Sequence, residues 1–334
     1  AVSKVYAVTP QRAPVVHLLE RGNPFQPKDA IAPAGVPAVR GLSSNFGLEP
    51  AAADAERRRK LAEWITDERN PLFARTIVNR IWHYHFGAGL IETPNDLGFS
   101  GGRPSHPGVL DTLATQLVAA DWSQKALHRE ILLSATYRQQ SHPRTAAVKI
   151  DADNRLLWRK SPARLEAEVV RDTVLSVAGQ LNPALGGRGF EDFRKYSEKN
   201  TWRYDPIDRE GAEFNRRSIY RTWARGGRNP LLDTFDCPDP STTSPRRSVT
   251  TTPLQALALL NNSFMLRMSD HFAQRLQREA GDDAPAQIAR AYQLAFGRAA
   301  TAAEIDRAQP FIREHGLPAF CRVMFNANEF LYVE

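Results

Sequence analysis

Polar side chains interrupt an otherwise apolar segment near residue 80. The segment PLFARTIVNRIWHYHF (71–86) has helical periodicity, and on a helix Arg75, Asn79 and His83 fall at i, i+4 and i+8 on one face, with Arg80 beside them. A polar stripe inside an apolar helix needs hydrogen-bond partners if it is buried. The stripe is therefore a candidate site for a carboxylate or for sugar hydroxyls. The alternative is that it braces the loop that follows.

His83 and His85 form a His-x-His pair, a spacing that on a strand would point both rings to one side. On a helix the two rings diverge by about 200°. Because the segment is predicted to be helical, we expect no metal at this pair. We also expect no cofactor in this chain. A metal site would need Asp96 or His106 to complete the ligand set.

Acidic residues recur on a helix predicted over 161–180. Arg164, Glu168 and Asp172 are spaced i, i+4 and i+8, and Glu166 lies off that stripe. Two carboxylates are able to work as an acid–base pair. The neighbouring arginines favour a salt-bridge network instead.

The candidate catalytic residues come from two stretches that lie far apart in the sequence: Asn79, His83 and Asp96 from one, and Glu166 and Glu168 from the other. If they converge in one cleft, an enzyme is favoured, because catalytic sites gather titratable groups with shifted pKa values. If they lie apart on flat surfaces, a scaffold is favoured. The sequence leaves open whether the protein is an enzyme.

Residues 182–250 are long, aromatic, basic and proline-rich. Aromatic rings provide flat apolar platforms, and arginine provides a planar fork for anions, so this insertion suits sugar rings that carry sulfate or carboxylate. The alternative is a core strand, RRSIYRTW, with solvated arginines. The candidate ligand-binding residues, two of them from the 71–86 segment, are Arg75, Arg80, Trp202, Arg217, Tyr220, Arg221, Trp223, Arg246 and Arg247.

These residues must be positioned by a mainly α fold. Residues 1–50 mix short β-branched runs with proline, glycine and asparagine, which is typical of an extended or β N-terminal arm. From residue 51 the period becomes helical, and Asn70-Pro71, Ser123, Thr252-Pro253 and the Thr301/Glu304 capping box predict helix starts. We therefore expect a multi-helix globular body over 51–334, with a loop-rich insertion at about 182–250.

Composition narrows the classes of function. The 334 residues include 42% apolar and 24% charged residues and carry a formal net charge of +7. Eight of the 44 basic residues are lysine, so arginine supplies 36, and these are spread along the chain rather than clustered. Nucleic acid is therefore not an expected partner. No transmembrane segment is expected, because no apolar run approaches the length of a membrane span.

Several phrases, taken together and in order, resemble the planctomycete-type C-terminal domain of unknown function that occurs in proteins bearing a cytochrome c module. They include RRRKLAEWITDERNPLFARTIVNRIWHYHFGAGLIETPNDLG, NRLLWRKSPARLEAEVVRD, TTTPLQALALLNN and NANEFLYVE. The resemblance implies an extracytoplasmic location, at the periplasm or cell surface, and a cytochrome c module as a possible partner. It implies no catalytic residues. The chain has no Cys-x-x-Cys-His, so it carries no covalent haem site.

Two functions are therefore expected as alternatives. The first is a module that binds or processes an anionic polysaccharide in a redox-linked, cytochrome-associated system. The second is a non-catalytic helical scaffold that docks partners at the cell surface.

Overall fold

A computed structural model describes residues 8–333 of the chain. Helix clearly outweighs strand, at 45% against 10%, and the sheets are small, so the mainly α fold is confirmed. The first seven residues of the predicted arm, and Glu334, lie outside the described residues. Contacts divide the chain into two compact units, and this division falls inside the stretch 51–334 that we expected to form one body.

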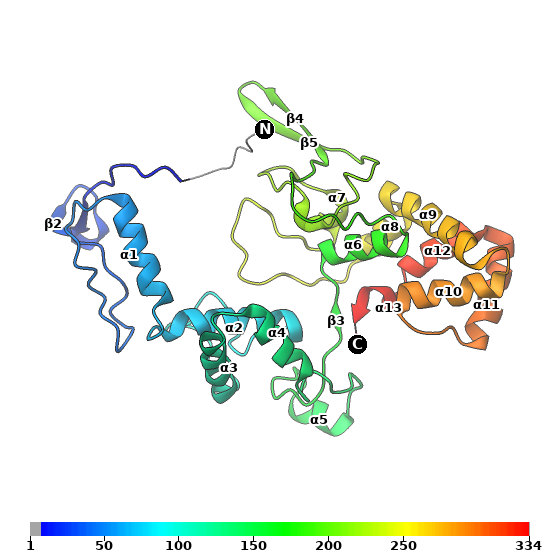
Figure 1. Cartoon of the computed structure of the whole chain (residues 1–334), viewed down its shortest axis with the longest axis horizontal. Coiled ribbons are helices and arrows are strands. Elements are labelled where there is room, and N and C mark those ends of the chain that lie inside the picture. The colour runs from blue at the N-terminus through cyan, green and yellow to red at the C-terminus, as the bar shows by residue number, and fades with distance from the viewer. Residues whose placement is uncertain (1–7, 334) are drawn as a thin grey trace. The chain divides into compact units, whose positions relative to one another are not determined.

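Unit 1 comprises residues 1–139 and 144–158. It begins with an antiparallel pair of strands, in which Val16 lies opposite Ile31, and continues with helices (Figure 1). Its elements are β1 (Val16–Leu19), η1 (Glu20–Gly22), β2 (Pro27–Ile31), α1 (Asp54–Thr66), α2 (Pro71–Phe86), α3 (Pro107–Ala119), α4 (Gln124–Leu133) and α5 (Thr145–Ile150).

Helix α2 begins and ends where the sequence predicts. The Asn70 side chain accepts a hydrogen bond from the Leu72 N–H, and Pro71 occupies the first helical position. The helix ends at Gly87, whose φ of 80° lies in the left-handed region that glycine adopts without strain. The buried face of α2 packs against α3 and α4 to form the core of unit 1, which includes Val78, Trp82, Leu110, Leu117 and Ile131.

Unit 2 comprises residues 140–143 and 159–334. Its strands are β3 (Ala163–Arg164), β4 (Phe193–Glu198), β5 (Thr201–Pro206) and β6 (Tyr332–Val333), with β3 paired to β6 and β4 paired to β5. Its helices are α6 (Ala167–Val177), η2 (Ser218–Tyr220), α7 (Pro230–Thr234), α8 (Pro253–Asn261), α9 (Ser263–Ala280), α10 (Ala284–Phe296), α11 (Ala302–His315), α12 (Leu317–Phe325) and α13 (Asn328–Leu331).

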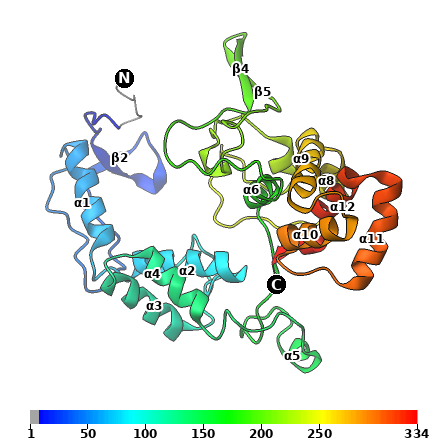
Figure 2. The same cartoon turned by 45° about the vertical axis from the view of Figure 1, so that its right-hand side comes forward.

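The core of unit 2 lies among α6 and the C-terminal helices, which Figure 2 shows gathered together. Phe272 of α9 and Phe325 of α12 are fully buried, with ring centroids 5.4 Å apart. The predicted capping box is present at α11, where the Thr301 hydroxyl accepts from the Glu304 N–H and Glu304 accepts from the Thr301 N–H. Burial of these apolar faces supplies the main stabilisation of the unit.

Two predicted elements are wrong. The helix expected from Ser161 begins at Ala167, because Arg164 lies in β3 and pairs with Tyr332 of β6. The strand expected for RRSIYRTW (216–223) contains the turn of 3-10 helix η2 and makes only isolated bridges to residues 182 and 190.

No described helix is both long and apolar enough to cross a membrane.

Both cysteines are free and buried, and this predicts their reactivity. Burial raises the pKa of Cys237 to about 12, and it also raises the pKa of Cys321. Because the thiolate is the reactive form, we expect neither thiol to react with an aromatic disulfide reagent until the protein unfolds. Rapid reaction of the native protein, assigned with a Cys237→Ser variant, would contradict this packing.

Candidate functional site

The polar stripe of α2 has structural partners in unit 1. Asn79 is only 1% exposed; its Nδ2 donates to the Ile91 carbonyl over 2.9 Å, and its Oδ1 accepts from the Ile91 N–H over 2.8 Å. Arg75 pairs with Asp111, and Arg80 donates to Asn95 over 3.2 Å. These contacts are those of a brace between α2 and the segment after it.

The two histidines of α2 contact different neighbours. The His83 ring is half-buried and lies edge-on to Tyr84, whereas His85 Nε2 lies 2.8 Å from His128 Nδ1. Within residues 8–333 no group of three or more His, Cys, Asp or Glu side chains is arranged to hold a metal ion.

Asp96 closes a turn in the loop after α2. Its Oδ1 accepts from the Gly98 N–H over 2.9 Å, and its carbonyl accepts from the Thr93 hydroxyl. The candidate residues Asn79, His83 and Asp96 thus belong to unit 1, whereas Glu166 and Glu168 belong to unit 2.

Glu166 and Glu168 flank the start of α6 and meet a single arginine. Arg247 holds Glu168 through both of its terminal nitrogens, at 2.5 and 2.9 Å, and its Nε lies 3.5 Å from Glu166. Burial alone would raise the pKa of Glu168, but the Arg247 hydrogen bonds outweigh it and lower that pKa. Burial raises the pKa of Glu166. The predicted salt-bridge network is present here, with Arg247 in place of Arg164, which pairs with Asp236.

The basic-aromatic insertion separates into buried and exposed residues. Arg221 is 4% exposed, donates to Asp192 over 2.8 Å, and lies 4.7 Å from the Trp223 ring. Arg216, also buried, stacks on Tyr220 at 3.8 Å and donates to three loop carbonyls.

The remaining candidates of the insertion reach the surface. Arg217 and Arg246 are exposed, Trp202 is 62% exposed, and Trp223 is 40% exposed. The insertion is therefore partly core and partly surface, and it matches neither alternative as a whole.

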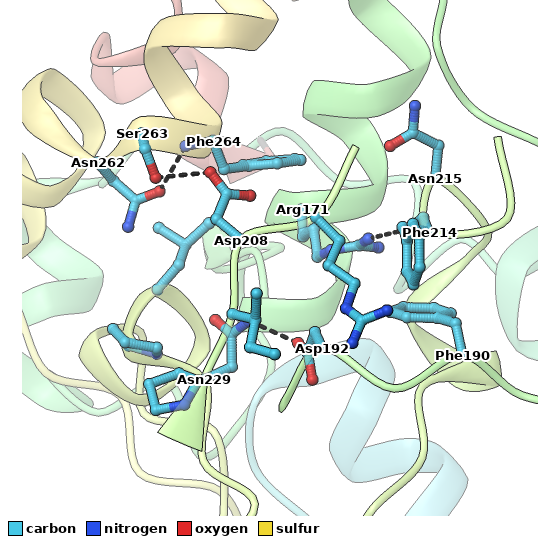
Figure 3. A pocket seen from close by; sticks show the side chains of 15 residues that line it. Arg171, Phe190, Asp192, Asp208, Phe214, Asn215, Asn229, Asn262, Ser263 and Phe264 are labelled. Atoms are coloured by element: carbon cyan, nitrogen blue, oxygen red, sulfur yellow. Dashed lines mark hydrogen bonds between the residues drawn. The ribbon is translucent and has the colours of Figure 1, made fainter. Parts of the chain in front are cut away.

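A pocket of about 240 Å³ lies in unit 2 beside the buried Arg171 (Figure 3). The Arg171 guanidinium donates to the carbonyls of Phe214 and Arg216, and burial lowers its pKa. The rings of Phe190 and Phe264 lie 5.1 and 5.6 Å from it. The wall of the pocket thus combines a cation with aromatic rings.

Carboxylates and carboxamides complete the wall. Asp208 accepts from Ser263 and from both terminal nitrogens of Arg267; these bonds lower the pKa of Asp208 against the opposing effect of burial. Asn229 and Asn262 cap α7 and α9 through their Oδ1 atoms and also line the pocket. The N-terminus of the long helix α9 therefore lies at the pocket, and this is the positive end of the helix dipole.

Asp192 has one oxygen that is satisfied and one that is not. Its Oδ2 accepts from Arg221 Nε at 2.8 Å and from Asn229 Nδ2 at 2.7 Å. Its Oδ1 is buried and has no hydrogen-bond partner in the described part of the chain. The residue is 9% exposed and lines the pocket. A buried carboxylate oxygen without a donor is costly, so Asp192 is a strained polar element of the pocket wall.

Most of this pocket has no signature in the sequence. Arg171 only adjoins the acidic stripe of 161–180, and Asp192, Asn229 and Asn262 belong to no motif. The available signal was weak: Asn-Pro at 229–230 and Asn-Ser at 262–263 are helix starts, and helix starts often gather around ligands.

The brace made by Asn79 predicts a large loss of stability on truncation. In Asn79→Ala, two buried backbone groups of Ile91 lose their partners, and we expect the free energy of unfolding to fall by about 3 kcal/mol. The matched control is Asn95→Ala, which removes an exposed partner of Arg80. It should change the free energy of unfolding by less than about 0.5 kcal/mol. Denaturant unfolding measures both; an unchanged stability in Asn79→Ala would favour a binding role instead.

The Arg247 pair predicts a pH-dependent effect. Glu168→Gln removes a charge whose folded-state pKa is lowered, and we expect a loss of about 2 kcal/mol at neutral pH. Because a lowered pKa stabilises above the ordinary value of 4.5, the difference from wild type should shrink as the pH falls below it.

The control for this effect is Glu166→Gln. The pKa of Glu166 is raised, so its charged form is disfavoured by folding and its removal should cost little. Unfolding curves from neutral to acidic pH compare the two variants. Equal losses, or a Glu168→Gln effect independent of pH, would contradict the assignment.

Comparison with known proteins gives one match. The model of the family described as PSD1, protein of unknown function (DUF1553), matches residues 57–312. No curated protein and no solved structure matches the chain. Since the match covers most of the sequence, the chain belongs to the PSD1 (DUF1553) family, whose function is unknown.

Proposed function

We propose that the Arg171 pocket of unit 2 binds one sugar ring of an acidic polysaccharide. The observation that carries the proposal is the lining of this pocket, which places Arg209, without an ion pair among the described residues, beside aromatic rings. A sugar ring offers hydroxyl donors at its edge and an apolar face, and both suit this wall.

The size of the pocket favours a small group. Its volume of about 240 Å³ lies below the range of about 300–1,000 Å³ that is typical of sites for drug-sized ligands. One ring fits this space, whereas a fused cofactor or a nucleotide needs more. A polymer would place one of its units in the pocket and leave the rest outside.

The charges around the pocket favour an acidic ligand. Asp192 and Asp208 line it, but each is already paired with an arginine, Arg221 and Arg267 respectively. Asp172 lies 3.6 Å from Arg171 and Glu210 lies 3.7 Å from Arg267, so the lining charge left without an ion pair in the described part of the chain is that of Arg209. A single carboxylate or sulfate on the sugar would offset the remaining charge.

Binding, rather than cleavage, is the activity that we propose for this pocket. Glu166 and Glu168, the acids expected to form a catalytic pair, are both held by Arg247. An extracytoplasmic location, a planctomycete-type origin and a cytochrome c partner are further parts of the proposal, and they rest on the sequence resemblance alone.

The second candidate function is a partner-docking scaffold. The strands β1 and β2 are exposed along their whole length, and Phe25 between them is 91% exposed. A two-stranded sheet with exposed apolar residues is marginally stable alone, so a partner that covers it would stabilise it.

Calorimetry with oligogalacturonate and with carrageenan oligosaccharides tests the binding proposal. We expect an acidic oligosaccharide to bind, and added salt to weaken binding because it screens the arginines. Arg209→Ala should reduce the affinity roughly tenfold, since it removes a charged contact. Asn215→Ala should reduce it less, because Asn215 contributes only a neutral carboxamide to the wall.

Arg278→Ala is the matched control, because Arg278 lies in the last turn of α9, at the opposite end from the pocket. It should bind like the wild type. If no acidic oligosaccharide binds, or if Arg209→Ala and Arg278→Ala behave alike, the pocket is not the site. The scaffold function would then be preferred.

A further inference from the structure

The hairpin β4–β5 starts and ends at the pocket. Asp192 immediately precedes β4, Pro206 ends β5, and both line the pocket. The Ile207 N–H donates to the Asp192 carbonyl over 2.8 Å, which closes the base of the hairpin. Figures 1 and 2 both show the hairpin projecting beyond the rest of unit 2.

One face of the hairpin has its charges paired. Residues alternate between the two faces of a strand, so Arg194 and Tyr196 share a face with their cross-strand partners Asp205 and Arg203. Arg194 pairs with Asp205 at 3.2 Å, and Arg203 pairs with Glu198 at 3.3 Å. This face therefore presents no net charge to a ligand.

The opposite face carries an unpaired cation beside aromatic rings. Lys195 lies opposite Tyr204, and Trp202 lies opposite Ser197, one diagonal step from Lys195. Trp202 is 62% exposed, and Lys195 is exposed without a carboxylate partner among residues 8–333. The Tyr204 ring packs edge-on against the Phe193 ring, with centroids 5.5 Å apart.

We propose that this Lys195–Trp202 face is a second contact surface for the same acidic polysaccharide, so that the ligand is a chain rather than a single sugar. The inference rests on the proposed function of the pocket. From pocket-lining Pro206, the residues Tyr204 and Trp202 follow on the same face, over about 13 Å of strand. A chain with one ring in the pocket would pass along this face, stack on Trp202 and place an acidic group near Lys195.

The test compares oligogalacturonates of increasing length. Ligand-observed NMR measures the disaccharide, and calorimetry measures the hexasaccharide. For the wild type we expect the hexasaccharide to bind more tightly than the disaccharide. Trp202→Ala and Lys195→Ala should each reduce hexasaccharide affinity about five- to tenfold and leave disaccharide affinity unchanged.

Tyr196→Ala is the matched control, because it removes an aromatic ring from the opposite face of the same hairpin. In this variant the affinity should still rise with oligosaccharide length as it does in the wild type. Circular dichroism and thermal unfolding establish that all three variants are folded; Trp202 and Lys195 make no core contact, so their removal should not unfold unit 2.

Four results would overturn the inference. Equal affinities for short and long oligosaccharides would leave the pocket as the only site, and the proposed function would stand without the hairpin. A loss in Tyr196→Ala equal to that in Trp202→Ala would remove the assignment to one face. Failure of every oligosaccharide to bind would reject both the hairpin surface and the polysaccharide. Displacement of the bound hexasaccharide by a lower concentration of oligothymidylate, a single-stranded nucleic acid, would also reject both.

Discussion

Buried guanidinium groups hold the irregular half of unit 2 together. Between α6 and α8 the chain has little regular backbone pairing, so many carbonyls need donors that a helix or sheet would otherwise provide. Arg171, Arg216 and Arg221 provide them, because each is buried and donates to one or more backbone carbonyls of this region. A guanidinium has five N–H donors in a rigid plane, which lets one side chain fix several loop segments at once.

The same constraint shapes the pocket. Arg221 fixes Asp192 through one carboxylate oxygen, and this leaves the other oxygen without a donor. The Arg171 guanidinium lies near the rings of Phe190 and Phe264 and is held there by its hydrogen bonds to backbone carbonyls. Its charge therefore stays at the pocket wall, although burial lowers its pKa. The groups that give the loops their structure thus also give the pocket its chemistry.

Sequence patterns predicted the helices better than the site, for local reasons. The N-cap at Asn70, the C-cap glycine at Gly87 and the capping box at Thr301 are interactions between residues a few positions apart. Such local patterns can be recognised in the sequence alone. The hairpin β4–β5 was missed because its turn, Lys199-Asn200, has positive φ at both residues without the glycine that usually signals such a turn. The pocket was missed because Arg171 binds carbonyls more than forty residues away, a pairing that no local pattern records.

Amide hydrogen exchange of the whole chain, with and without an oligogalacturonate hexasaccharide, shows which segments an acidic oligosaccharide contacts. Exchange reports on each segment separately, so it locates the ligand without any substitution. We expect slower exchange at the hairpin and loop of residues 192–215 and at the start of α9, and no change in α2 or the loop after it. Protection confined to unit 1, around Asn79 and Asp96, or no protection anywhere, would contradict the proposed binding.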